Sequence, residues 1–217
     1  MAAQPAAEAR PMFPLQSALL PGETLPLRIF EPRYALLVQD CLAAPEPAFG
    51  VVLISQGSEV GGGDVRSDVG ALARITECAD LGDGLYQLVA TVGERIRVQQ
   101  WLADDPYPRA LIRAWPDEDG PPVGPEQIGG VVDRILALYG RVAEAAGGRL
   151  RADALAVDAE TADDPSLHLF ALAARVPMGQ ADRYAVLAAP TLAERVDAVC
   201  EAIDTVAAMV EFQLSEE

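Results

Sequence analysis

Lysine is absent from this chain of 217 residues, so every one of its 16 basic residues is an arginine. Schiff-base enzymes, Ser-Lys proteolytic dyads and the G-x-x-x-x-G-K-[ST] phosphate loop all require a lysine amine. The absence of lysine therefore excludes Schiff-base chemistry, a Ser-Lys dyad and this phosphate-binding loop. Histidine is almost as scarce, since His168 is the only one.

Cysteine is also scarce. Cys41, Cys78 and Cys200 are far apart, odd in number and lack any Cys-x-x-Cys spacing. This pattern predicts free, buried thiols in a reducing compartment rather than a disulfide framework or a zinc site. The acidic pairs of the loops have no histidine nearby, so we expect no metal and no cofactor.

Positive charge is in deficit, because 33 acidic residues leave a net charge of −17. Nucleic-acid affinity comes largely from neutralising phosphates, so this balance opposes nucleic acid as a partner. The chain also lacks an apolar run of the ~20 residues that a membrane helix needs, and its first residues show no signal pattern. We therefore expect a cytoplasmic protein without a membrane partner.

Two regions of different character make up what is present. After a flexible tail at 1–11, residues 12–116 alternate in the manner of short strands and contain one early helix, Phe30 to Leu42. A proline-rich linker follows at 117–124, and residues 125–217 keep helical spacing. The expected strands are 12–15, 24–29, Phe49–Ile54, Val69–Cys78, Leu85–Val92, Glu94–Leu102 and Tyr107–Trp115. The pattern predicts an α+β fold, with a strongly bent sheet or small barrel first and helices second.

Short-range signals add detail to this pattern. Pro32 suits the first turn of the early helix, Asp164 can cap a helix that has Pro165 at its first position, and Thr191 to Glu194 form a capping box. The alternation of Glu94–Leu102 predicts that Arg95 lies on the solvated face of its strand.

Several fragments occur in a telling order. They are the opening MFPLQSALLPGETLPLRIFEPRY at 12–34, VGALARI at 69–75, VGERI at 92–96 and LAER at 192–195. Together they resemble the N-terminal substrate-binding domain of Lon-type proteases. The resemblance implies a PUA-like β-barrel or bent-sheet domain followed by a C-terminal helical bundle.

The same resemblance implies a function. Lon uses lysine in its ATP-binding loop and in its Ser-Lys dyad, and this chain has neither lysine, so we expect a free-standing relative of the domain and not an enzyme. The implied activity is non-enzymatic binding of exposed apolar segments of client proteins, with unfolded chains and a protease as partners. The oligomeric state stays open.

Phe30, Glu31, Arg33 and Tyr34 are the candidate peptide-binding residues. In one interpretation the aromatic rings line a shallow apolar groove and the charged pair orients a peptide backbone. In the other, Tyr34 begins the buried stripe of the helix while Glu31 and Arg33 decorate its first turn.

Two alternatives come from other functional classes. A hydrolase could use a cleft around His168, with Ser166 and Asp164 nearby, although residues two apart on a helix do not face each other and no G-x-S-x-G elbow occurs.

The glycine-rich Gly61-Gly62-Gly63-Asp64 invites a phosphate-loop interpretation, but a strand follows it, so we interpret it as a strand connection.

The second alternative is RNA binding through the PUA-like fold. The net charge opposes it. A local cluster of arginines on neighbouring strands could override that charge: Arg74, Arg95, Arg97 and Arg113.

Overall fold

The computed structural model describes residues 7–56, 65–149 and 154–215, and the Gly61–Asp64 motif therefore lies outside the described residues. The chain divides into two compact units, Met1–Pro116 and Asp117–Glu217. The first is a β unit with one helix and the second is helical, so the expected α+β class is confirmed.

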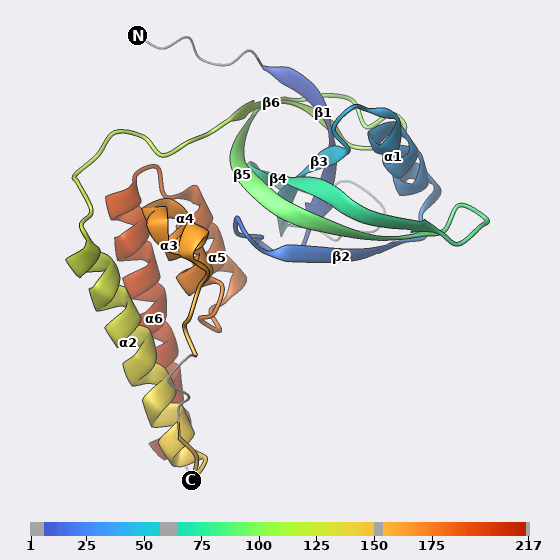
Figure 1. Cartoon of the computed structure of the whole chain (residues 1–217). Helices are drawn as coiled ribbons and strands as arrows, with labels where there is room; N and C mark the ends of the chain where they lie inside the picture. The colour runs from blue at the N-terminus through green and yellow to red at the C-terminus, as the bar shows by residue number, and fades with distance from the viewer. Residues whose placement is uncertain (1–6, 57–64, 150–153, 216–217) are drawn as a thin grey trace. The chain divides into compact units, whose positions relative to one another are not determined.

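The β unit is a small barrel with one strand added at its margin (Figure 1). Its sheet has the order β2-β5-β4-β3-β1-β6, and a further β5–β6 pairing closes β1, β3, β4, β5 and β6 into a ring. Among the described residues β2 pairs with β5 alone. The strands are β1 Glu8–Leu15, β2 Thr24–Ile29, β3 Ala48–Gln56, β4 Val65–Asp80, β5 Tyr86–Trp101 and β6 Arg109–Ala114. β1 begins inside the segment 1–11 that we expected to be a tail.

One long strand replaces two expected ones. The sequence predicts strands at Leu85–Val92 and Glu94–Leu102, but β5 runs unbroken from Tyr86 to Trp101. Its register against β4 shifts where Ala71 pairs with Arg95 and Ala73 with Val92, which marks a β-bulge at Gly93-Glu94. A bulge bends a strand without ending it, so β5 stays paired with β4 on both sides of the bulge. It pairs in addition with β2 at Tyr86–Thr91 and with β6 at Ile96–Trp101.

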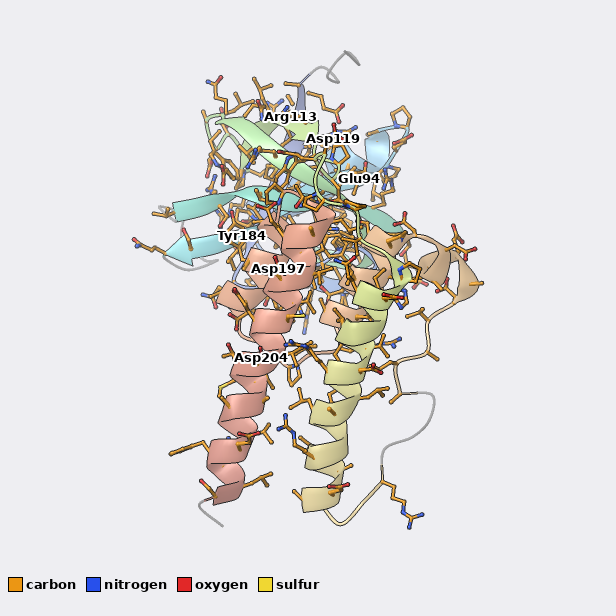
Figure 2. The ribbon with its side chains drawn as sticks, turned by 90° about the vertical axis from the view of Figure 1, so that its left-hand side faces the viewer. Glu94, Arg113, Asp119, Tyr184, Asp197 and Asp204 are labelled. Atoms are coloured by element: carbon orange, nitrogen blue, oxygen red, sulfur yellow. The ribbon has the colours of Figure 1, made fainter. Side chains whose placement is uncertain are left out.

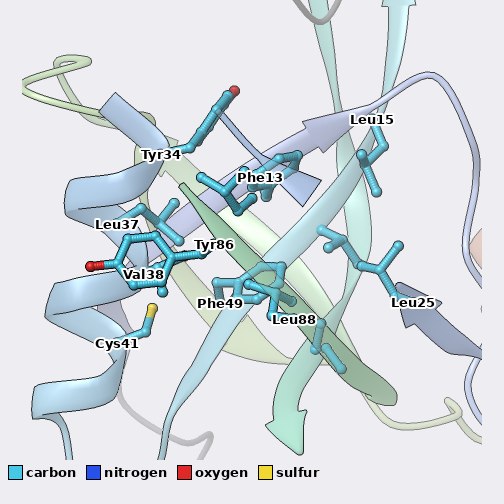
Figure 3. Packing of buried hydrophobic residues seen from close by; sticks show 14 of the residues in the cluster. Phe13, Leu15, Leu25, Tyr34, Leu37, Val38, Cys41, Phe49, Tyr86 and Leu88 are labelled. Carbon is cyan, nitrogen blue, oxygen red and sulfur yellow. The ribbon is translucent and has the colours of Figure 1, made fainter. Parts of the chain in front are cut away.

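The helix α1 (Pro32–Ala43) covers one opening of the barrel, and its start follows from its sequence. Pro32 occupies the first turn, as predicted, where its missing N–H is not needed. The apolar face of α1 enters a core that includes Phe13, Phe49 and Leu88 (Figure 3). Three polar contacts tie the same helix to the barrel: Gln39 Nε2 donates to the Tyr86 hydroxyl at 3.1 Å, the Cys41 thiol to the Ala48 carbonyl at 3.3 Å and the Tyr107 hydroxyl to Asp40 at 2.5 Å.

Two expectations for the β unit are wrong. Arg95 was placed on a solvated face of its strand, but its side chain is only 4% exposed because its guanidinium stacks on the Trp115 ring at 4.3 Å. Cys78 was expected to be buried, but it is exposed near the end of β4, beyond the part of the strand that contributes to the core.

The helical unit contains α2 (Pro125–Ala145), α3 (Ala159–Asp163), α4 (Pro165–Ala173), α5 (Gln180–Ala188) and α6 (Leu192–Ser215). The capping box predicted at the start of α6 is confirmed, because the Glu194 N–H donates to Thr191 Oγ1 at 3.2 Å and the Thr191 N–H to Glu194 Oε2 at 3.1 Å. Figure 2 labels Asp204 on α6, and Arg134 on α2 contacts both of its carboxylate oxygens at 3.1 Å. No helix in the described ranges combines the length and apolarity needed to cross a membrane.

Arg195 is the most unusual side chain of this unit, because it is fully buried and charged. Its guanidinium lies 4.0 Å above the Phe170 ring, and Nη1 donates to Asp117 Oδ2 at 3.1 Å and to the Ser166 hydroxyl at 2.7 Å. Nη2 donates to the other oxygen of Asp117. The bidentate pair joins the segment before α2 to α6, and the serine contact adds α4. These contacts compensate a charge that would otherwise be very costly to bury.

The three thiols are expected to react in the order of their exposure, with Cys78 first, the partly buried Cys200 second and Cys41 last. Burial, with a smaller contribution from Asp40, raises the pKa of Cys41 to about 12, whereas Cys78 is exposed. Only the thiolate is reactive, so at pH 8 Cys78 should react first with a disulfide reagent and Cys41 only on unfolding. Thiol titration of the native protein and of Cys78→Ser measures this. Loss of the fast phase in the variant is the expected result, and a fast phase that survives the substitution would contradict it.

Candidate functional site

An apolar cavity of about 110 Å³ lies in the β unit between the end of β1 and the connection from β2 to α1. Its walls are Phe13 and Leu15 from β1, Leu27, Arg28 and Ile29 from β2, and Phe30, Glu31 and Tyr34 from the start of α1. Three of the four candidate peptide-binding residues thus line one cavity. The fourth, Arg33, is absent from the lining and contacts two of the others.

Phe30 is a large apolar side chain of this site that is open to solvent, with 63% of its surface exposed. It lies between the last residue of β2 and the first turn of α1, where the chain changes direction. A large aromatic ring in this position gains little from the core. Exposed apolar surface beside an apolar cavity is the feature that typically marks a contact site.

Tyr34 belongs to the core more than to the surface. It is 4% exposed and its ring stacks on Phe13, with centroids 4.2 Å apart and planes inclined by 28°. Figure 3 shows the two rings next to each other in the buried cluster. Tyr34 is therefore a buried residue of the α1 stripe, as the structural interpretation predicts, and it also lines the cavity.

Glu31 and Arg33 form an ion pair at the rim. Arg33 Nε lies 3.0 Å from Glu31 Oε2, both side chains are about a quarter exposed, and the Arg33 guanidinium lies 4.5 Å from the Tyr34 ring centre. Glu31 is also the N-cap residue of α1, whose carbonyl accepts from the Tyr34 and Ala35 N–H groups, but its side chain makes no capping bond. The Glu31 carboxylate is thus directed toward Arg33, which offsets its charge at the rim.

Arg28 is the lining residue that the sequence interpretation missed. It lies on the exposed side of β2 and has no ion pair within the part of the chain that the structure describes. The available signal was its position, because it is the only charged residue among the six of this strand. Phe13, Leu15, Leu27 and Ile29 were also missed as lining, since core and cavity residues look alike in a one-dimensional pattern.

A second hollow lies in the helical unit, where α2 ends beside the last turns of α6. It measures about 270 Å³ and is lined by Val142, Ala145, Ala146, Val210, Gln213 and Leu214. Phe212 on the same helix is 64% exposed, close to the value for Phe30. This hollow contains none of the residues singled out from the sequence, and it supplies a comparison surface for binding experiments.

The residues proposed for hydrolysis have structural contacts instead. The Ser166 hydroxyl accepts a hydrogen bond from Arg195, and the Asp164 carboxylate accepts from the Ser166 and Leu167 N–H groups as the N-cap of α4. His168 is half-buried on the same helix, and its backbone N–H donates to the Asp164 backbone carbonyl at 2.9 Å. No serine–histidine hydrogen bond is formed among these side chains, so nothing in this cluster supports acyl transfer.

The four arginines proposed for RNA do not form an open basic surface. Arg74 makes a bidentate pair with Glu94 at 2.8 and 2.9 Å, and Arg95 is buried against Trp115. The Arg97 guanidinium also lies over that tryptophan ring, at 4.2 Å, and Arg97 stands opposite Arg113 in the β5–β6 register. Figure 2 labels Glu94 and Arg113 on these neighbouring strands. With one arginine paired and one buried, little charge is left for phosphates.

Metal ligation has no candidate in the described ranges. No group of three or more histidine, cysteine, aspartate or glutamate side chains converges there in a way that could hold an ion. Asp117, one of the acidic loop residues considered from the sequence, is instead the partner of Arg195.

Comparison with known proteins gives a consistent result. The model of the ATP-dependent protease La (LON) substrate-binding domain family matches residues 9–205. Among curated proteins, a Lon protease of Roseiflexus castenholzii is 26% identical over 190 residues, which is 87% of this chain and 23% of that protein. Lon protease 2 of Sorangium cellulosum is 33% identical over 121 residues, or 52% of this chain and 14% of that protein. The chain thus spans less than a quarter of the length of these relatives.

Solved structures show the same relationship. A Lon N-terminal domain protein from Xanthomonas campestris superimposes with a TM-score of 0.64 at 27% identity, covering 89% of this chain and 98% of that one. The N-terminal domain of a Mycobacterium avium complex Lon protease gives a TM-score of 0.59 at 14% identity over 91% of this chain and 98% of its own. At that identity the second likeness is one of fold.

Proposed function

Because the chain belongs to the LON substrate-binding domain family, we propose that it binds exposed apolar segments of client proteins at the cavity beside Phe30 and catalyses no reaction itself. The observation that supports this site is an aromatic side chain 63% exposed at the rim of an apolar cavity. A protease is the expected recipient of the clients. The cytoplasm, where free thiols persist, is the expected location.

The size of the cavity sets the strength of binding. Its volume of about 110 Å³ is below the ~150 Å³ of an apolar protein cavity that admits a benzene molecule, so it has room for at most one client side chain. Burying one leucine or phenylalanine side chain contributes roughly 1.5–3 kcal/mol before the costs of association. A single anchor therefore yields weak and broad recognition. That is the behaviour expected of a module that captures many unfolded sequences.

The test is binding of fluorescent apolar peptides to the purified chain and to Phe30→Ser. Loss of the aromatic contact should weaken binding by about tenfold, the effect of truncating an interface anchor worth roughly 1.4 kcal/mol. Fluorescence anisotropy with a panel of apolar and polar peptides measures it, and only the apolar peptides should respond to the substitution.

Phe212→Ser is the matched control, because Phe212 is 64% exposed but lies on α6 beside the other hollow. It should leave peptide affinity unchanged. If Phe212→Ser weakens binding while Phe30→Ser does not, the client site lies in the helical unit and the proposal is wrong. Absence of apolar-peptide binding by the unaltered protein would also overturn it.

A further inference from the structure

β2 has one long edge without a neighbouring strand in the described part of the chain. The Val92 N–H donates to the Glu23 carbonyl, and Thr24 to Ile29 then stand opposite Thr91 to Tyr86 in register. Because hydrogen-bonded and non-bonded pairs alternate in an antiparallel ladder, the backbone groups of Leu25, Leu27 and Ile29 point toward β5. Those of Thr24, Pro26 and Arg28 point away, toward the vacant edge.

Proline makes this edge selective. Pro26 has no N–H, and prolines within sheets are confined to edges because they cannot donate to a ladder. The donors left on this edge are therefore the N–H groups of Thr24 and Arg28. Of these two residues, Arg28 lines the cavity. An added strand would thus find its donor and acceptor beside the apolar cavity and a gap in donors farther along.

The charge at this edge is also defined. Glu31 is compensated by Arg33 at 3.0 Å, whereas Arg28 is exposed and has no ion pair within the described ranges. The cavity rim therefore carries one uncompensated positive charge, in a protein whose net charge is −17. A partner that complements this edge supplies a carboxylate next to its apolar anchor.

From these three observations we infer that the client segment binds as an added β-strand on the Arg28 end of β2, with a large apolar side chain in the cavity and an acidic side chain on Arg28. The inference rests on the proposed function and specifies its substrate class. Side chains of a strand alternate between faces. All three residues line the cavity, but Arg28 is exposed while Leu27 is half-buried and Ile29 buried, as expected of side chains that alternate along β2. We therefore expect the anchor and the acidic residue to be immediate neighbours in the client sequence.

The experiment uses blocked decapeptides, without terminal charges, that carry one leucine in a threonine-rich strand sequence. The first peptide has glutamate directly after the leucine, the second has glutamate two residues after it, and the third has glutamine directly after it. The adjacent pair should bind about five- to tenfold more tightly than either of the others. N-methylation of one backbone amide that pairs with β2 should weaken binding by at least about tenfold, since it removes a main-chain hydrogen bond and crowds the edge.

Arg28→Glu should reverse the preference, so that a leucine–arginine peptide binds better than the leucine–glutamate one. Arg109→Glu, an equal change of charge at an exposed arginine of β6, should not. If apolar peptides bind in a Phe30-dependent manner but ignore glutamate spacing, N-methylation and Arg28→Glu, the strand-addition inference is wrong while the proposed function stands. If binding does not depend on Phe30 at all, the proposed function itself fails.

Discussion

Asp117→Asn is expected to destabilise the helical unit by about 2–3 kcal/mol, although it replaces only one carboxylate oxygen with an NH2 group. The substitution removes the carboxylate that compensates Arg195, whose side chain is fully buried. Breaking a buried ion pair leaves an uncompensated charge, which typically costs about 3–5 kcal/mol. We place the expected value lower because the Asp117 side chain is 25% exposed and water can replace part of its contribution.

Urea unfolding followed by the helical circular-dichroism signal measures this effect. The matched control is Asp204→Asn, the same substitution in the pair with Arg134, whose side chains are 50% and 68% exposed. An exposed pair contributes at most about 1 kcal/mol, so the control should shift the midpoint little. Equal shifts for the two variants would mean that Arg195 does not depend on Asp117.

Gly70→Ala is expected to destabilise the β unit by about 3 kcal/mol or more. A Cβ added at Gly70 in β4 would lie 2.1 Å from the Val51 carbonyl oxygen and 2.7 Å from Val52 Cγ1 of β3. The closer atom belongs to the backbone of a paired strand, so it cannot move aside as a flexible side chain would. Relief of the clash requires β3 and β4 to separate.

Gly130→Ala in α2 is the opposite case, since its Cβ would meet nothing within 4 Å. Alanine is the better helix former, so this variant should gain about 0.5–1 kcal/mol. Thermal unfolding of both variants tests the pair of predictions. A Gly70→Ala protein as stable as the parent would show that the β3–β4 contact is looser than described here.

Local signals were enough to predict the helix starts. Pro32 in the first turn of α1, Asp164 with Pro165 before α4 and the Thr191–Glu194 capping box all act through residues within four positions of each other. Such contacts can be predicted because both partners lie close together in the sequence. The Gly82-Asp83-Gly84 turn was predictable for the same reason, because all three residues have positive φ values that favour glycine at two of the positions.

Features that depend on distant partners were not predictable. Nothing near Arg95 in the sequence shows that Trp115, twenty positions away, shields its guanidinium. The bulge that keeps β5 continuous depends on its register against β4. The cavity combines β1, β2 and α1, and the role we infer for Arg28 depends on β2 having β5 as its single partner strand among the described residues.

The candidate site was predicted in part. The sequence pointed to the turn from β2 into α1, and Phe30, Glu31 and Tyr34 do line one cavity there. Their use in binding stays a prediction.

The most direct test of client binding at the cavity beside Phe30 is a methyl NMR titration of the chain with an apolar peptide. We expect the methyl resonances of Leu15, Leu27 and Ile29, which line the β-unit cavity, to shift. Those of Val142, Val210 and Leu214, which line the hollow of the helical unit, should not. Shifts confined to the second set, or no shifts at peptide concentrations that saturate binding, would contradict it.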